Sequence, residues 1–413
     1  MTRSGKLFSS MALPLIAAAA LLSLAACSSN KSVDVQKAAF WPTQPDEPRL
    51  QFLVSFSQSS DIAPRKSALD DLIYGKEPQK VLPIKKPYGV AMWNGRIYVC
   101  DLRGAAVLVL DLRNHQTLVM GQTGSDTLLS PSGIAISPDG MKYVADIGRG
   151  MVYVFDAQDK LFGKIGHKDM KPTGIAVHQD ELYVSDQKAQ QIEIYNRNTG
   201  KLLRKLGEPG MADGQFIWPL GIAVDDKGQI YVADVLKCQI QKFDHQGSHL
   251  ATISGASRSV GGLVRPKHIA VDHDGTVFVV DSAFQNVQLF DPIGRVYTFF
   301  GGGGDFPGAM QMPVGICLHD GDLDLFQKYV HPAFQAEKLV VVSNQFGDKK
   351  VSVYAYGRLR PGKTLADISA SQGLVKLGLG DNTPGALAID PNAAEDSDAT
   401  AQPTTQPTTQ PSR

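Results

Sequence analysis

Apolar and polar residues alternate in short runs along most of the chain, which is the period-two pattern of half-buried β-strands. The runs fall into a unit that begins with Pro-x-Gly-Ile-Ala or a close variant and recurs every 41 to 47 residues. The copies of this unit begin at Pro87, Pro131, Pro172, Pro219, Pro266 and Pro313. A repeat of this length corresponds to one four-stranded propeller blade. The pattern therefore predicts an all-β fold, a six-bladed β-propeller.

Each unit continues with a polar turn and three further strand-like runs. In the fourth unit the second run is 231–234, the third is 240–244, and the last ends at Gly255. Val, Ile, Tyr and Phe dominate these runs, as expected for a sheet with one buried face. The order is repeated in the sister units, so we expect the same four strands in each blade.

The sixth unit departs from this order. It contains an insert at 322–338, followed by strand-like runs at 339–344 and 351–354, and it has no obvious fourth strand. The N-terminal run 49–56 could supply that strand, which would close the ring and remove its exposed edges. The insert resembles a short amphipathic helix interrupted by Pro332. It would either pack under the sheet or present a docking surface to a partner.

The repeated Pro-x-Gly-Ile-Ala sequence, followed by Tyr-Val-Ala-Asp and an alternating strand, resembles the NHL repeat over residues 87–354. A narrower resemblance is to bacterial six-bladed propeller lipoproteins. It rests on Trp41, Pro42, Pro45, Pro48 and Arg49, on His331-Pro332-Ala333-Phe334, and on Val342-Ser343-Asn344-Gln345-Phe346-Gly347. Such lipoproteins tend to be encoded near multihaem cytochromes, so the resemblance implies a cytochrome among the candidate protein partners. A shared fold alone does not fix the function.

The N-terminal segment has the features of a lipoprotein signal peptide. Arg3 and Lys6 precede an apolar stretch at 11–24, which ends in Leu24-Ala25-Ala26-Cys27-Ser28. This ending resembles a lipobox, in which Cys27 would carry the lipid and become the new N-terminus. No later stretch approaches 18 uninterrupted apolar residues, so we expect a membrane anchor through the lipid at Cys27 alone. Ser28 in place of Asp favours the outer membrane over the inner membrane of the cell envelope.

The chain ends in a Pro/Thr/Gln repeat at 401–411 that has almost nothing apolar to bury. The expected organisation is therefore a signal peptide at 1–26, a tether at 27–39, the propeller at 40–373 and a disordered tail at 374–413.

Charge and cysteine content add little to this picture. The 41 basic and 41 acidic residues give a formal net charge of zero, which offers no general attraction for nucleic acid. Cys100, Cys238 and Cys317 show no metal-binding spacing. Cys100 and Cys317 stand where sister units carry a small apolar residue, so we expect buried free thiols there.

Candidate binding residues gather around the expected mouth of the central channel. The Pro-x-Gly loop and the loop after each second strand should share one face. The cations and the other polar residues expected there are Tyr88, Arg103, Arg149, Lys188, Lys237, Lys267 and His268, of which His268 replaces a Gly that the other units keep. We interpret them as a basic, partly aromatic funnel for an anionic ligand or partner. Alternatively, these charges pair with neighbouring acids or point to solvent.

A ring of acidic residues should lie beside the funnel: Asp101, Asp146, Asp186, Asp234 and Asp281, with Asn344 in the sixth unit. An Asp at one position of every blade favours a turn-forming role, in which its carboxylate accepts backbone N–H groups. Lactonase-type propellers hold calcium with acidic and Asn ligands, and an amidating lyase of the NHL type holds zinc with histidines. Here no three histidines converge in the pattern, so no catalytic residue, metal or cofactor is predicted.

These observations predict a lipid-anchored, non-catalytic propeller that binds a protein partner as a scaffold module. The alternative is a metal-dependent lyase or lactonase of the propeller type.

Overall fold

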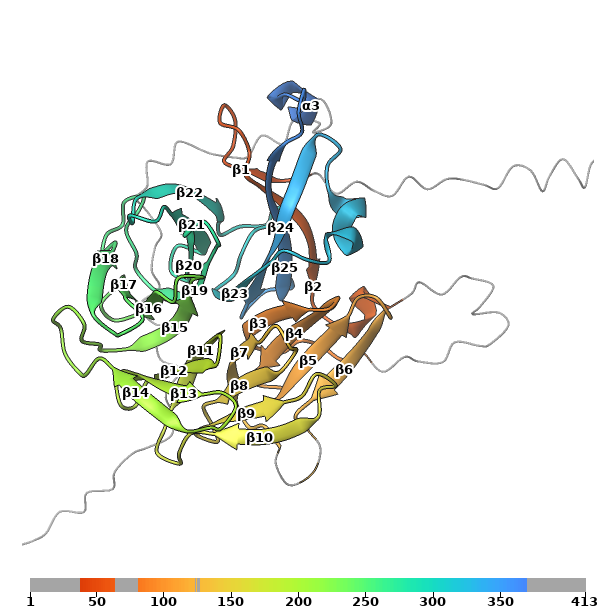
Figure 1. Ribbon diagram of the computed structural model, residues 1–413. Helices are drawn as coiled ribbons and strands as arrows, with labels where there is room; N and C mark the ends of the chain where they lie inside the picture. Colours follow the sequence, from red (N-terminus) through yellow and green to blue (C-terminus); the bar gives the residue numbers. More distant parts are fainter. Residues whose placement is uncertain (1–37, 64–80, 123, 125–126, 370–413) are drawn as a thin grey trace, which may run out of the picture. The chain divides into compact units, whose positions relative to one another are not determined.

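The computed structural model describes residues 38–63, 81–122, 124 and 127–369. Cys27, the segment expected to be a signal peptide and the segment expected to be a C-terminal tail all lie outside the described residues. The described part is an all-β, six-bladed propeller (Figure 1), as predicted. No helix of the described part is long and apolar enough to cross a membrane.

Each of the first five blades is an antiparallel sheet whose strands follow chain order from the inside outwards. Blade 1 consists of β3 (Pro87–Trp93), β4 (Arg96–Asp101), β5 (Ala106–Asp111) and β6 (Gln116–Met120). Blade 2 consists of β7 (Pro131–Ile136), β8 (Lys142–Asp146), β9 (Met151–Phe155) and β10 (Leu161–Ile165). Blade 3 consists of β11 (Pro172–His178), β12 (Glu181–Asp186), β13 (Gln191–Asn196) and β14 (Leu202–Leu206).

The next two blades repeat this order. Blade 4 consists of β15 (Pro219–Val224), β16 (Ile230–Asp234), β17 (Gln239–Phe243) and β18 (His249–Ile253). Blade 5 consists of β19 (Pro266–Val271), β20 (Val277–Asp281), β21 (Asn286–Phe290) and β22 (Val296–Gly301). The Pro-x-Gly-Ile-Ala sequence thus forms the innermost strand of every blade, as Figure 1 shows around the central axis.

The sixth blade joins the two ends of the described chain. It contains β23 (Pro313–His319), β24 (Phe334–Asn344), β25 (Val351–Leu359) and the N-terminal strand β2 (Leu50–Phe56), in the order β2-β25-β24-β23. β2 pairs antiparallel with β25, with Leu50 opposite Tyr356. The predicted ring closure is therefore confirmed. A short strand that was not predicted, β1 (Phe40–Trp41), adds to the outer edge of β2.

The insert of the sixth unit packs into the core. It forms a 3-10 helix, η2 (Leu323–Tyr329), rather than an α-helix, and its Phe326 is 1% exposed within a cluster that includes Phe334 and Phe56. Two short helical turns complete the structure, η1 (Ser59–Asp61) and α3 (Leu365–Ser369). Of the two roles left open for the insert, the packing of its apolar side chains supports the core role.

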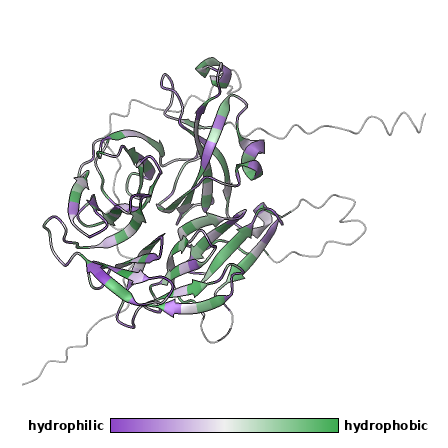
Figure 2. Ribbon diagram, viewed as in Figure 1, coloured by the Kyte–Doolittle hydropathy of each residue, from purple (hydrophilic) through white to green (hydrophobic). Residues whose placement is uncertain are grey.

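Apolar side chains between neighbouring blades form the core. Tyr98 and Val107 of blade 1 pack against Val144 and Tyr153 of blade 2, and similar clusters follow around the propeller. Figure 2 shows this apolar character along the strands. The burial of these aromatic and aliphatic side chains removes large apolar areas from water and holds neighbouring blades together without helices.

Backbone crowding explains the repeated glycine. A Cβ on Gly174 would lie 1.9 Å from the carbonyl oxygen of Leu220 in the next blade. A Cβ on Gly221 would lie 2.6 Å from the Cα of His268. The innermost strands therefore approach each other so closely that only glycine fits at these positions.

Two faces of the propeller are distinguished by their loops. The mouth face carries the loops after the second strands and the loops before the six prolines. The opposite face carries the turns between first and second strands and between third and fourth strands. On the opposite face, fully buried Lys142 donates to the carbonyl oxygens of Asp156 and Ala157 at 3.0 Å and pairs with Asp159 at 2.7 Å.

Candidate functional site

The predicted turn role of the acidic ring is confirmed on the mouth face. Asp234 is typical: its Oδ2 accepts the N–H of Ile217 at 2.8 Å, and its Oδ1 accepts those of Trp218 and Lys237 at 3.0 and 3.2 Å. Asp101, Asp146 and Asp281 use both oxygens in the same way. These side chains hold the loop before each proline against the loop after each second strand.

Three of the predicted funnel cations are held by neighbouring loops. Arg149 donates to the carbonyl oxygen of Thr127 at 3.0 Å. Lys188 forms an ion pair with Asp169 at 3.5 Å, with both side chains mostly exposed. Lys237 donates to the carbonyl oxygens of Ala212 and Gln215. These contacts agree with the alternative considered above, in which the charges pair locally.

Lys267 differs from these three cations. It lies on β19, and its side chain makes no hydrogen bond or ion pair with any described residue. Burial, together with the positive charges of Arg265 and Lys86, lowers the pKa of its ammonium group to about 8. Lys86 belongs to blade 1 and Arg265 to blade 5, so cations from both sides of blade 6 converge on Lys267.

His268 adds a second unusual group to the same strand. It is 7% exposed, and neither ring nitrogen makes a hydrogen bond of normal geometry with a described residue. Burial lowers the pKa of its imidazole to about 4, although the nearby backbone of Ile269 opposes part of that shift. The ring is therefore uncharged at neutral pH. A buried polar side chain without partners is rare in folded proteins and calls for an explanation.

The two remaining predicted residues lie on blade 1. The carbonyl oxygen of Tyr88 accepts the Ser343 hydroxyl, and burial raises the pKa of its phenol. Arg103 is exposed, and its side chain makes no hydrogen bond or ion pair within the described part of the chain. Burial lowers the pKa of nearby Lys350, Asp101 opposes that shift, and the positive charge of Arg103 adds to it.

Lys86 and Arg265 are the residues that the sequence reasoning missed. Each directly precedes the proline of its unit, where the other units carry Ser130, Lys171, Trp218 and Met312. The signal was visible in the sequence, because the position before proline lies in the loop that was already assigned to the mouth face. The blade order then brings units one and five near each other across unit six.

A calcium ion in the acidic ring does not fit this arrangement. Calcium takes six to eight oxygen ligands. The carboxylates of Asp101, Asp146, Asp234 and Asp281 point instead at backbone N–H groups. His268 is the one histidine on the innermost strands within their Pro-x-Gly positions, so a three-histidine zinc site does not form there either.

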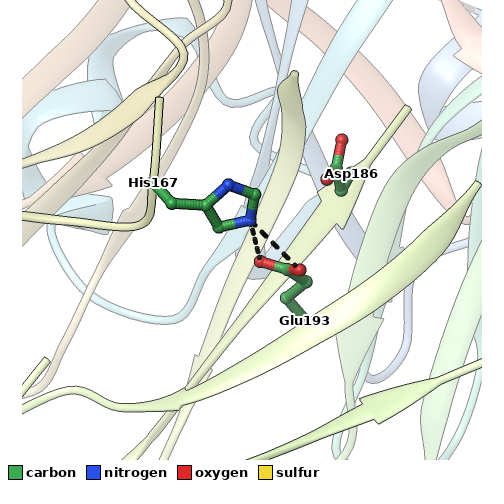
Figure 3. Close-up of side chains that lie close together, drawn as sticks. All are labelled: His167, Asp186 and Glu193. Atoms are coloured by element: carbon green, nitrogen blue, oxygen red, sulfur yellow. Dashed lines mark hydrogen bonds and ion pairs between the residues drawn. The ribbon is translucent and has the colours of Figure 1, made fainter. Parts of the chain in front are cut away.

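One group of possible metal ligands is found within the described ranges. His167, Asp186 and Glu193 place their ligand atoms within 4.8 Å of one another (Figure 3). His167 belongs to the loop between β10 and β11, Asp186 ends β12, and Glu193 lies on β13. His167 Nε2 is 3.4 Å from both Glu193 carboxylate oxygens.

The opposite face has a shallow polar groove of about 400 Å³ between blades 3 and 4. His178, Asp226, Lys227, Asp244 and His245 are among the residues that line it. Its acids and cations are mixed, and it has no unpaired buried group like those on the mouth face.

Residues 75–260 match the family model described as SMP-30/Gluconolactonase/LRE-like region. Protein brain tumor of Drosophila melanogaster is 30% identical over 129 residues, which is 29% of this chain and 12% of that protein. A probable peptidyl-alpha-hydroxyglycine alpha-amidating lyase of Caenorhabditis elegans is 28% identical over 129 residues, covering 30% of this chain and 32% of the lyase. The chain thus spans a third or less of these curated relatives.

Solved structures share the fold. A structural genomics protein from Bacteroides thetaiotaomicron has a TM-score of 0.52 at 17% identity, covering 66% of this chain and 70% of that chain. Virginiamycin B lyase from Staphylococcus aureus has a TM-score of 0.48 at 12% identity, covering 66% of this chain and 95% of that chain. At these identities the similarity extends to the propeller fold alone.

Proposed function

We propose that this chain is an enzyme of the lyase or lactonase type, which acts on an anionic substrate at the mouth face around Lys267. The observation that carries the proposal is the unpartnered, partly buried Lys267, whose pKa is lowered to about 8. Strongly shifted pKa values cluster at functional sites. The match to a family model that includes gluconolactonases, and the partial identity to an amidating lyase, favour this function over the scaffold role expected from the sequence.

Lys267 would act as the general base. With a pKa of about 8, a substantial fraction of its side chain is a neutral amine at mildly alkaline pH, and this amine can accept a proton from a substrate carbon or from an attacking water. An ordinary lysine, with a pKa near 10.4, would be almost fully protonated there. The neighbouring His268 stays uncharged, so it adds no further positive charge beside the amine.

Lys86 and Arg265 would hold the anionic group of the substrate. Their positive charges act on the pKa of Lys267, which supports a role for them in binding a carboxylate near the reacting atoms. Binding of the anion would neutralise part of this charge. The arrangement would therefore select substrates in which a carboxylate or similar anion lies near the scissile bond.

The test is turnover of a panel of lactones and of α-hydroxylated peptide amides by the purified chain, followed by proton release or product mass. We expect Lys267→Met to lower kcat/KM about a hundredfold or more, and the exposed Lys160→Met on the opposite face to have no effect. The wild-type rate should rise with pH to a plateau above about 8. Equal turnover by the wild type and Lys267→Met would overturn the assignment.

A protein partner on the mouth face is the second candidate. Leu236 is 60% exposed and Trp218 is 37% exposed, beside the cations of the same loops. A mixed apolar and basic surface suits a partner with an acidic face, such as a cytochrome. Extraction of the native membrane followed by affinity capture should recover a haem protein with the wild type and lose it with Leu236→Glu. Recovery in equal amount with both would contradict a docking role for this surface.

We also propose that Cys27 carries a lipid that holds the propeller at a membrane of the cell envelope, with the outer membrane preferred. Support comes from the lipobox-like Leu24-Ala25-Ala26-Cys27. Expression of the full chain should place it in the membrane fraction, and Cys27→Ala should release it or leave the precursor unprocessed. Mass spectrometry of the N-terminal peptide should show a diacylglycerol on Cys27. An unmodified Cys27 would refute the anchor.

A further inference from the structure

Asp186 is the exception within the acidic ring. Its Oδ1 accepts the N–H groups of Lys171, Lys188 and Ala189 at 2.9, 3.0 and 3.3 Å, as its counterparts do. Its Oδ2 accepts no hydrogen bond from a described residue, whereas the same atom of Asp101, Asp146, Asp234 and Asp281 accepts a backbone N–H at 2.6 to 2.8 Å. The residue is 1% exposed.

The loop before blade 3 explains the missing donor. The N–H that would reach Oδ2, by analogy with Ile217 in blade 4, belongs to Met170. Met170 instead donates to the carbonyl oxygen of His167 at 3.0 Å, because this loop turns back on itself. The same turn brings the His167 imidazole over Asp186 and Glu193 (Figure 3). The loop thus removes a donor from a buried carboxylate and places a potential metal ligand there.

We propose that His167, Asp186 and Glu193 bind one divalent transition-metal ion of the zinc class in the seam between blades 2 and 3. One imidazole nitrogen and two carboxylates are ligands that Zn²⁺ takes in sites with an open position for water. Calcium and magnesium prefer oxygen ligands alone. His167 is 47% exposed on its side chain, so water has access to complete the coordination.

Hydrogen bonds and a lysine ammonium group offset the negative charge of Glu193, and a metal ion would replace part of this set. Its side chain is fully buried and accepts from Tyr195 and, at 3.1 Å, from Gln191. The Lys205 ammonium lies 3.1 Å from Oε1 and is 48% exposed, so it can move into solvent when a dication takes its place. No comparable cation reaches Asp186 Oδ2 among the described residues, so this oxygen is the ligand that needs no rearrangement.

The first test measures Zn²⁺ binding to the full chain after chelator treatment, by calorimetry with dialysis and metal analysis. We expect one Zn²⁺ per chain, and we expect His167→Ala to weaken it on the order of a hundredfold. The matched control is His249→Ala, which removes a partly exposed histidine far from this seam and should leave the affinity unchanged. Binding that is equal in wild type and His167→Ala, or no binding at micromolar Zn²⁺, would overturn the proposal.

A second variant tests the competition with Lys205. Removing its charge in Lys205→Met should tighten Zn²⁺ binding several-fold, because the metal no longer displaces an ammonium group from Glu193. Replacing Zn²⁺ with Co²⁺ provides a visible spectrum that reports nitrogen and oxygen ligands directly, and His167→Ala should abolish it. An unchanged Co²⁺ spectrum in that variant would place the metal elsewhere. These readouts do not depend on enzyme activity, so they stand apart from the function proposed for Lys267.

Discussion

Two lysines on opposite faces of the propeller, Lys142 fully buried and Lys267 partly buried, differ in how their charge is held. Lys142 on the opposite face is fully buried, with two carbonyl oxygens and the Asp159 carboxylate around its ammonium group. It also lies over the Trp93 ring, 4.8 Å from the ring centroid. Lys267 on the mouth face has no acceptor within the described residues, and the charges near it are positive.

The difference separates a structural charge from one available for chemistry. Burial of an ammonium group is unfavourable unless hydrogen bonds and an opposite charge offset it. These stabilising contacts are present at Lys142, whose partner Asp159 also pairs with Arg96 of blade 1. Such contacts are absent at Lys267, where burial and neighbouring cations disfavour the charged ammonium group. An anionic ligand would stabilise that charge.

The largest expected effect is on the structural side of the comparison. Lys142→Met leaves the carbonyl oxygens of Asp156 and Ala157 without their donor and Asp159 without one of its cations. We expect the free energy of unfolding to fall by about 3 kcal/mol, measured by urea denaturation. The exposed Lys160→Met should change it by less than about 0.5 kcal/mol. Similar losses of unfolding free energy in the two variants would show that the buried contacts of Lys142 contribute little to stability.

The acidic ring provides the next test, on the mouth face itself. Asp234→Asn replaces an oxygen that accepts the Ile217 N–H with an NH₂ group, and we expect a loss of about 2 kcal/mol. Asp186→Asn changes an oxygen that accepts no N–H, so its loss should be less than half as large. Thermal denaturation without added metal is the measurement. Equal losses would show that Asp186 Oδ2 has a partner after all.

A pH titration sharpens the comparison at Lys267. Its pKa is lowered from the ordinary 10.5 to about 8 by folding, so the unfolded chain binds more protons between those values. The stability of the wild type should therefore rise, relative to Lys267→Met, as pH increases from about 8 to 10.5. Urea midpoints at several pH values give this difference. A difference that stays flat across the window would mean that Lys267 is not desolvated.

The smallest effect is expected at His273 on the opposite face. Its ring nitrogens lie 2.7 Å from Asp226 and 2.9 Å from Asp320, and these acids raise the pKa of the imidazole. Its stabilising effect is therefore present below pH 6.5 and lost as the pH rises through the folded pKa. All three side chains are mostly exposed, so His273→Ala should lose only a few tenths of a kcal/mol at pH 5 and nothing at pH 8.5. A loss that is the same at both pH values would exclude the ionic contribution.

The repeat made most of the fold predictable from the sequence. Six aligned prolines marked the innermost strands, and the run at 49–56 was correctly assigned as the strand that closes the ring. These features rest on local patterns of apolar residues and glycine, which each unit repeats. β1 was missed because a two-residue strand has no periodicity to detect.

The candidate sites depended on contacts between units, which a repeat does not encode. The convergence of Lys86 with Lys267 follows from the ring order, not from spacing along the chain. The free oxygen of Asp186 follows from the loop before Pro172, in the shortest of the spacings between prolines. That short spacing was visible in the sequence. The redirection of the Met170 N–H to His167 became visible only in the folded structure. Cys100 was correctly predicted as a buried free thiol, whereas Cys317 is partly buried.

The pairing of β2 with β25 also constrains when the protein can fold during its synthesis. β2 leaves the translation machinery early, but its partner strand ends at Leu359, about three hundred residues later. Until then β2 can pair only with the short β1, and its other edge has no strand to accept its backbone hydrogen bonds. Blades 1 to 5 can meanwhile form as local hairpins while the ring stays open. Truncated chains that stop before β25 should therefore leave one edge of β2 available for association with other chains.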